Sequence, residues 1–179
     1  MFLLNSVFPN LARVVKARIP AVVDETRKFD AFMKFGQFTK DEAVKALQPG
    51  FGPDLIVKNW GYSWGHYPDA GDDIWISEWL AQQYEMVFES RLSADGQGQV
   101  NGGERERWLR LVKHATLVVE STILHETVHW GDAKDGSTGD RAAWEAGWKD
   151  LGHMFVKEAY GDAFSYFKEK KSGLEHRAV

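Results

Sequence analysis

Five consecutive residues, His125-Glu126-Thr127-Val128-His129, have the types and the spacing of a catalytic metal site. On a helix, side chains four positions apart lie one turn above each other on the same face, so both imidazoles can bind a single ion. The Glu126 carboxylate then lies beside the open position of that ion, where it can take a proton from water. The motif predicts zinc (Zn2+) bound by His125 and His129, with Glu126 as the general base.

The residues around the motif predict that it lies on a buried helix. Apolar side chains surround it on nearly all sides: Val118, Val119, Ile123, Leu124 and Val128. Burying two histidines and a glutamate without partners is costly, and a bound cation would offset that cost. One helical face continues from Trp108 to His129, so we expect a long central helix that carries the motif near its C-terminal end and stops at Gly131.

Two residues are candidates for the third protein ligand that catalytic zinc usually takes. The chain has no cysteine, so the ligands must be histidine, aspartate or glutamate. Asp135 follows shortly after the motif, whereas Glu145 would come from the next helix. We favour Glu145, because Gly152 shares its predicted face and a small residue there would let the two helices approach closely. Asp135 is the alternative third ligand.

The last main helix is predicted to extend from Asp140, which can cap it, to Tyr160, where Gly161 stops it. The oxyanion that develops during amide hydrolysis needs a hydrogen-bond donor. Arg141, His153 and Tyr160 are the candidates by their place in the sequence. We otherwise expect His153 to support a ligand or to pack nearby, and not to bind the ion itself.

Helices and two short strands are predicted before the long helix that carries His125 and His129, which we call the metal helix. Pro9 suits a first helical position, and Pro20 is expected to interrupt the helix that follows it. Thr39-Lys-Asp-Glu42 matches a capping box. Strands are predicted at Leu55–Val57 and at Asp72–Ile76.

The second strand is our candidate for a sheet edge that lines the substrate cleft. Ser77 is expected to cap a helix that extends to about Glu89. The glycine-rich segment Ser93–Gly103 is predicted to be a loop within one domain of residues 1–179.

Composition excludes several classes of protein. Hydrophobic residues make up 44% of the 179 residues, with 8 Trp and 11 Phe, which excludes a disordered chain. No apolar run approaches the roughly 20 residues of a membrane span. A net charge of −4 without a basic stripe argues against a nucleic-acid partner. Met1–Leu4 lacks the features of a secretory signal, so we expect secretion by a route that needs no signal peptide, or the chain is a piece of a longer one.

Four segments of the chain resemble one known family. Ile123–Asp132, followed by Glu145-Ala-Gly147 and Glu158-Ala-Tyr-Gly161, is similar to the zincin metallopeptidase toxin domains of bacterial polymorphic toxins. Ala46–Pro53 resembles an early turn of the same family, so the likeness covers most of the chain. The chain is especially similar to the C-terminal metallopeptidase effector domain that some type VI secretion spike proteins of the VgrG class carry.

The resemblance implies an α+β, mostly helical, zincin-like domain with a long central metal-binding helix and a small β-sheet. It implies zinc on His125 and His129, Glu126 as the catalytic acid/base, and a downstream glutamate as the third ligand. It further implies an antibacterial effector, carried by or fused to a secretion spike protein, that hydrolyses a protein or peptide in the periplasm of the target cell. A cognate immunity protein is the expected partner.

Two other functions stay open on the residues alone. The same metal chemistry would hydrolyse the peptide cross-links of peptidoglycan. A metal-stabilised module without catalytic activity could instead bind a partner through the aromatic-rich loop at Trp60–Tyr67. Dependence of activity on Glu126 separates the enzymes from the binding module.

Overall fold

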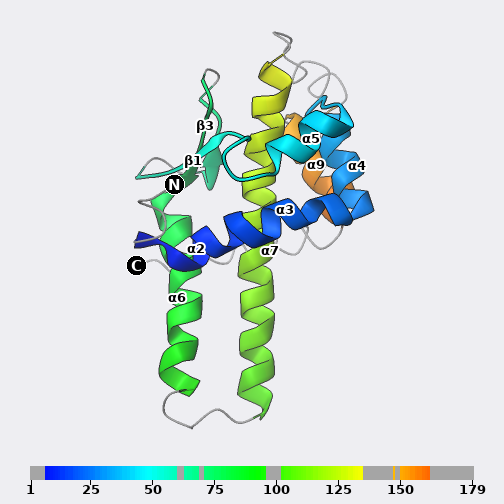
Figure 1. The fold of residues 1–179 in the computed structure, drawn as a ribbon. Coiled ribbons are helices and arrows are strands. Elements are labelled where there is room, and N and C mark those ends of the chain that lie inside the picture. Colours follow the sequence, from blue (N-terminus) through cyan, green and yellow to red (C-terminus); the bar gives the residue numbers. More distant parts are fainter. Residues whose placement is uncertain are drawn as a thin grey trace.

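The computed structural model describes residues 7–59, 63–68, 71–95, 102–134, 147 and 150–161, apart from the side chains of 90–95 and 102. Its elements in chain order are α2 (Pro9–Arg13), the π-helix η1 (Val14–Arg18), α3 (Ile19–Ala21), the 3-10 helix η2 (Val22–Asp24), α4 (Thr26–Phe35), α5 (Lys40–Ala46), β1 (Asp54–Lys58), β2 (Gly65–His66), β3 (Asp73–Ser77), α6 (Glu78–Asp95), α7 (Gly102–Ala133) and α9 (Leu151–Tyr160). Helices dominate, beside one small sheet (Figure 1), which confirms the predicted α+β, mostly helical fold.

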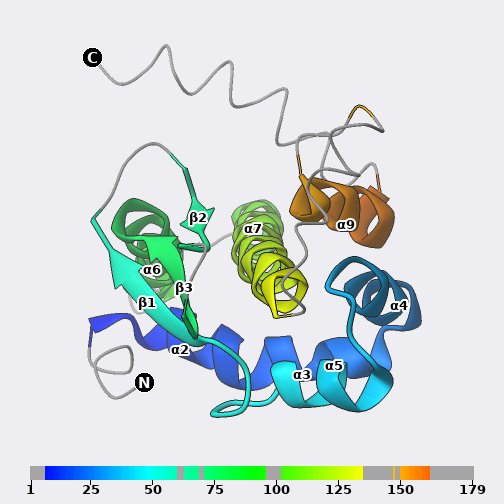
Figure 2. The same cartoon turned by 90° about the horizontal axis from the view of Figure 1, so that it is seen from above.

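The longest helix, α7, forms the centre of the molecule. Seen end-on, it has the sheet on one side, α9 on the other, and α2 to α5 along a third side (Figure 2). Its N-terminal half lies beside α6 and extends with it away from the other elements as a two-helix arm (Figure 1). The prediction of a long central helix is confirmed. Within the described ranges, no helix is both long and apolar enough to cross a membrane.

The connection between α6 and α7 is shorter than the predicted loop. The segment predicted as a loop began at Ser93, but α6 continues to Asp95 and α7 already begins at Gly102. Residues 96–101 of that segment lie outside the described residues. The two helices therefore take up both ends of the segment that its composition had marked as irregular.

The sheet has the strand order β1-β3-β2, so β3 is central and β2 is an edge. β1 runs parallel to β3, and β2 runs antiparallel to it, with Gly65 opposite Ile76. The predicted strand at Asp72–Ile76 is confirmed as β3, but its placement at the edge is wrong. The two residues of β2 occupy that edge, and they lie inside a segment whose glycines and aromatics had indicated a loop.

Local signals determine where several helices begin. Thr39 and Glu42 form the predicted capping box of α5, in which the Glu42 carboxylate accepts the Thr39 amide at 2.8 Å. The Ser77 hydroxyl caps α6 by accepting the Leu80 amide at 3.1 Å. Pro9 is the first residue of α2. Each of these starts depends on residues within one turn, which is why the sequence predicts them.

Pro20 does not interrupt the N-terminal helical stretch, contrary to the prediction. Helical structure continues from Pro9 to Asp24, because the residues just before Pro20 form the wider turns of η1. A π-helix pairs each amide with the carbonyl five residues back, and this change of pattern accommodates a residue that has no N–H to donate. The stretch packs against α7 with Leu11 and Val22 completely buried.

Gly131 does not end the metal helix, which continues to Ala133. A Cβ atom at position 131 would lie 2.2 Å from Cζ of Phe38 and 2.6 Å from the carbonyl oxygen of Gly36. The glycine therefore allows the turn between α4 and α5 to pack directly against the backbone of α7.

The last helix is shorter than predicted. Gly147 has a positive φ of 80°, and Asp150 is extended with φ −166° and ψ 172°. The helix α9 begins only at Leu151, so a single helix from Asp140 to Tyr160 is wrong. Gly161, with φ 57°, ends α9 where the sequence predicts.

A buried charge cluster attaches α9 to the centre of α7. The Glu120 side chain is 1% exposed, and its carboxylate accepts hydrogen bonds from Arg18 Nη2 at 2.8 Å and from the Tyr160 hydroxyl at 2.9 Å. Lys28 Nζ pairs with the same carboxylate. Removing one partner of such a buried charge would leave it uncompensated, so the cluster resists separation of the helices. Tyr160 is therefore directed at Glu120, and its proposed role as an oxyanion donor is wrong.

Candidate metal centre

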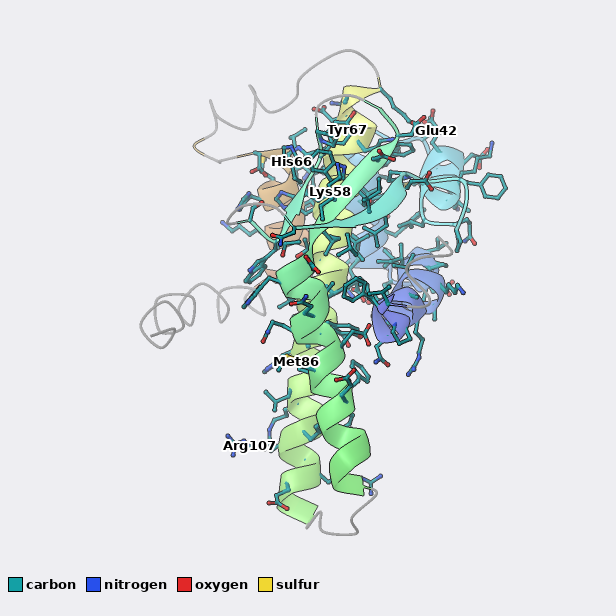
Figure 3. The ribbon with its side chains drawn as sticks, turned by 90° about the vertical axis from the view of Figure 1, so that its left-hand side faces the viewer. Glu42, Lys58, His66, Tyr67, Met86 and Arg107 are labelled. Atoms are coloured by element: carbon teal, nitrogen blue, oxygen red, sulfur yellow. The ribbon has the colours of Figure 1, made fainter. Side chains whose placement is uncertain are left out.

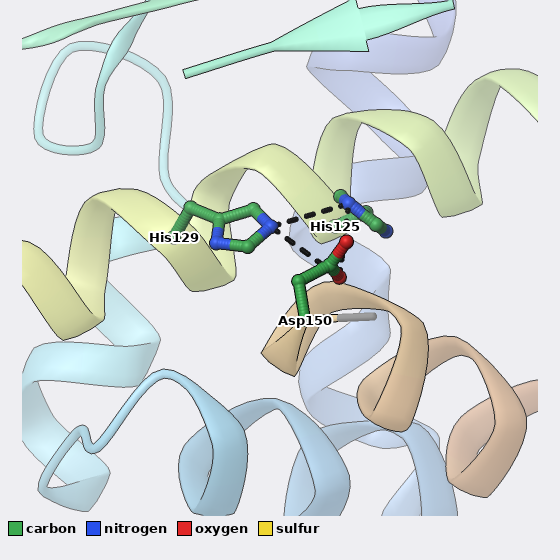
Figure 4. A group of neighbouring side chains, drawn as sticks. All are labelled: His125, His129 and Asp150. Carbon is green, nitrogen blue, oxygen red and sulfur yellow. Dashed lines mark hydrogen bonds and ion pairs between the residues drawn. The ribbon is translucent and has the colours of Figure 1, made fainter. Parts of the chain in front are cut away.

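Three side chains, two from α7 and one from the residue directly before α9, converge on one point. His125 and His129 lie one turn apart on α7, and their Nε2 atoms are 3.2 Å apart (Figure 4). Asp150, directly before α9, places Oδ1 3.6 Å from each of these nitrogens. Among the described residues, this is the only group of three or more histidine, cysteine or acidic side chains arranged to hold a metal ion.

The spacing of the three ligand atoms fits zinc. Atoms bound to a tetrahedral zinc at 2.0–2.1 Å lie about 3.3–3.4 Å from each other. The observed separations of 3.2 and 3.6 Å bracket that value. The three side chains are 15–22% exposed, so each of them is largely buried. Two imidazoles and one carboxylate, with a position left for water, make up a known donor set of catalytic zinc.

Asp150 is held in place because it also caps α9. Its Oδ1 accepts the backbone amide of His153 at 2.7 Å, as an N-cap residue does. Its Oδ2 lies 2.7 Å from Nδ1 of His153. An ionised carboxylate only accepts hydrogen bonds, so the His153 ring must donate here. The start of a regular helix therefore sets the position of the carboxylate.

The structure brings together the predicted ligands His125 and His129, and it adds Asp150, which the sequence analysis missed. Glu145 and Asp135, the two predicted third ligands, lie outside the described residues and stay predictions. Asp150 was hidden by the assumption of one continuous last helix. An aspartate directly before a new apolar helical repeat is an N-cap signal, and this signal would have pointed to it.

His153 is the predicted oxyanion donor that the described structure places beside the ligands. Its ring centre lies 5.0 Å from that of His125, and its side chain is 36% exposed. Arg141, the remaining candidate, lies outside the described residues. The contact of His153 with Asp150 agrees with the expectation that this histidine supports a ligand.

His125 and Asp150 have protonation states that suit cation binding. Burial, followed by the nearby charge of His129, lowers the pKa of His125 to about 3, so its imidazole is neutral at physiological pH. Burial alone would raise the pKa of Asp150, but interactions with His129 and His153 outweigh it and hold this pKa well below its usual value. Neutral imidazoles and an ionised carboxylate are the forms that bind a metal.

Glu126 lies next to the first ligand and is turned toward the sheet. The residue is 6% exposed, and burial raises its pKa to about 7, partly opposed by His129 and by a hydrogen bond from the Tyr67 amide. A general base works best when its pKa lies near the operating pH. The buried carboxylate is therefore suited to accept and release a proton near neutrality.

Gly152 allows α9 to contact the first ligand directly. A Cβ atom at this position would lie 2.5 Å from Cγ, Cδ2 and Nε2 of the His125 ring. The same ring donates a hydrogen bond to the Gly152 carbonyl. The expectation that a small residue at 152 allows close approach to the metal helix is confirmed, and the partner it approaches is a ligand.

Gly152→Ala is expected to weaken zinc binding by about 10- to 100-fold, the usual effect of disturbing a group that orients a ligand. The new methyl group displaces the His125 ring, whereas alanine in a helix is more favourable than glycine, so the fold itself should persist. Competition with a fluorescent zinc chelator measures the affinity. Lys157→Ala, at an exposed position of the same helix, is the matched control. Equal affinities in wild type and Gly152→Ala would contradict the contact.

Comparison with known proteins identifies the family of the chain. The family model described as metallopeptidase toxin 3 matches residues 5–161, a range that includes both histidines, Glu126 and Asp150. No curated protein and no solved structure matches the chain. A metallopeptidase requires a metal ion, and the group formed by His125, His129 and Asp150 can hold one. The chain belongs to the metallopeptidase toxin 3 family.

Proposed function

We propose that the protein is a zinc-dependent peptidase in which His125, His129 and Asp150 bind the ion and Glu126 is the general base. One observation carries this proposal: three ligand atoms converge at the spacing of a tetrahedral zinc site, and the residue that directly follows the ligand His125 is a buried carboxylate, Glu126. Membership of a metallopeptidase toxin family supports the reaction class and leaves the ion and the third ligand to be tested.

The residues around the site account for each step that the protein must perform. Zinc bound here would polarise the carbonyl of a peptide bond and make water acidic enough to lose a proton near neutral pH. Glu126, with a pKa of about 7, takes that proton and later passes it to the leaving amine. His153 donates to Asp150 and so keeps the ligand carboxylate oriented during the reaction.

We further infer that the peptidase is an antibacterial effector. The toxin family supports a harmful activity, and a toxin that cleaves peptide bonds requires a protein or peptide substrate in its target and an immunity protein in its producer. The resemblance to effector domains of secretion spike proteins supports delivery without a signal peptide and action in the periplasm of the target cell.

Removal of the metal should abolish activity reversibly. The purified protein is expected to contain about one zinc per chain. Dialysis against a chelator should stop the cleavage of dye-labelled casein, and zinc should restore it. Magnesium should not, because it prefers six oxygen ligands over imidazoles. Elemental analysis and dye release measure the two quantities, and incubation with purified sacculi tests whether cell-wall peptides are cleaved instead.

Two results would overturn the proposal of a zinc peptidase. Repeated preparations without zinc would exclude the resident ion. Cleavage that persists after complete removal of the metal would exclude its role in the reaction. If peptides are released from sacculi but casein is not cleaved, the metal chemistry is retained and the substrate is peptidoglycan.

A further inference from the structure

The edge strand β2 lies against the proposed general base. The central helix α7 lies between β2 and α9, so the sheet and α9 pack against different sides of it (Figure 2). A Cβ atom on Gly65 would lie 2.6 Å from Oε1 and 2.8 Å from Cγ of Glu126, and 2.8 Å from Cγ2 of Thr122. Carbon atoms in good contact are about 3.5–4.0 Å apart, so no side chain fits at this position without displacing a neighbour.

The backbone of β2 has little freedom to move away from Glu126. β2 pairs antiparallel with the central strand, and the Ser77 amide donates to the Trp64 carbonyl at 2.9 Å. Ser63 Oγ donates to the Gly65 carbonyl at 2.7 Å. Trp64 packs against the hydrophobic core. A methyl group added at Gly65 would therefore shift the Glu126 side chain before it shifted the strand.

A second contact from the same strand region reaches the same carboxylate. The backbone amide of Tyr67, just after β2, donates a hydrogen bond to Glu126. Figure 3 shows His66 and Tyr67 where the sheet lies beside α7. This amide is a donor whatever side chain residue 67 carries, so its position depends only on the path of the backbone. The His66 ring between the two contacts packs on Trp75, with ring centres 5.3 Å apart.

We propose that Gly65 is a positioning residue for Glu126. The bare Cα of Gly65 leaves room for the carboxylate, and the Tyr67 amide holds it there, so the edge of the sheet sets the orientation of the general base. The positions of the ligands Asp150 and His125 depend instead on α9, because Asp150 caps this helix and Gly152 contacts the His125 ring. The inference rests on the proposed role of Glu126 and assigns its positioning to β2.

Gly65→Ala separates the positioning of the base from metal binding. The variant is expected to bind one zinc per chain with unchanged affinity, while kcat falls about 100-fold, the scale expected for a reacting group displaced by about 1 Å. KM should stay within a few-fold of wild type. The probe is a quenched fluorescent peptide chosen from a mixed-sequence library by its cleavage with wild type. His66→Ala, one residue along the strand, should keep kcat near wild type.

A stability cycle tests the contact without any assay of activity. Gly65→Ala should lower Tm by roughly 2–12 °C, because it overpacks a filled space. In a Glu126→Ala background the same substitution should lower Tm by clearly less, since two of the three nearest atoms, Oε1 and Cγ of Glu126, are then absent. Because the cycle compares the loss of Tm in the two backgrounds, it remains informative even if Gly65→Ala makes the protein less stable.

Several outcomes would overturn the positioning role. One is wild-type kcat in Gly65→Ala, and another is an equal loss of Tm in both backgrounds. A loss of zinc in proportion to activity would show instead that the glycine acts through the metal site. Failure of the proposed function can be distinguished from failure of the positioning role. If Glu126 is not the general base, Glu126→Gln should be as active as wild type. The stability cycle would still report whether Gly65 and Glu126 interact.

Discussion

Glu126→Gln is expected to reduce peptide hydrolysis by about 10²- to 10⁴-fold, the usual contribution of a positioned acid or base. Glutamine has nearly the size of glutamate, and its amide oxygen can still accept the Tyr67 hydrogen bond, but it cannot take a proton from water. Zinc content should stay at about one per chain, because the three ligands are untouched. Stability should not fall, since the change removes a buried ionisable group.

Cleavage of the fluorescent peptide and elemental analysis measure these two results. Glu106→Gln, at an exposed position in the N-terminal half of the same helix, is the matched control and should behave as wild type. Expression directed to the periplasm of a susceptible bacterium should stop growth with wild type and with Glu106→Gln, but not with Glu126→Gln. Expression retained in the cytoplasm should leave growth unaffected.

Toxicity that survives Glu126→Gln would exclude a peptidase mechanism. It would favour the alternative in which the metal only stabilises a binding module. Equal toxicity in both compartments would be compatible with a peptidase mechanism, but it would contradict the proposal that the periplasm is the place of action.

Asp150→Asn is expected to weaken zinc binding by more than about 100-fold, beyond the range seen when only a residue behind a ligand is changed. The neutral amide loses the charge that attracts the cation. Asparagine is nevertheless as good an N-cap as aspartate, so α9 should still begin at Leu151. Asp150→Ala removes both roles and should lower the stability of the metal-free protein by about 0.5–2 kcal/mol relative to Asp150→Asn.

Two further substitutions decide which residue is the third ligand. Glu145→Gln and Asp135→Asn test the two residues that the sequence analysis predicted, and both should retain wild-type affinity if Asp150 binds the ion. Isothermal titration with zinc and thermal unfolding of the metal-free variants give the two readouts. Tight binding in Asp150→Asn together with weak binding in Glu145→Gln would transfer the ligand role to Glu145.

The parts of the structure that the sequence predicts depend on neighbours in the chain. His125 and His129 share a helical face because they are four residues apart, and the Thr39 and Glu42 capping box closes within one turn. The parts that it does not predict depend on contacts between distant segments. β2 is a strand because β3 pairs with it, and Gly131 lies inside a helix at a point where the turn at Phe38 packs directly on that helix.

Asp150 belongs to both groups, which explains why it was missed. Its capping role is local and could be recognised from the residues that follow it. Its ligand role depends on the packing of α9 against α7. This packing brings Gly152 onto the ring of His125, a residue 27 positions earlier in the chain (152 − 125 = 27). A pattern of spacing along one helix carries no information about that distance.

The two attachments of α9 have a mechanical consequence. The last residue of this helix is anchored by the bond between Tyr160 and Glu120, whereas its first turn is tied to α7 through the ligands around Asp150. At 1.5 Å per residue, the two ties are about 15 Å apart. An ion at the ligand end would add binding free energy to only one of them. Zinc would therefore strengthen the attachment of the first turn of α9 and leave the attachment at Tyr160 unchanged.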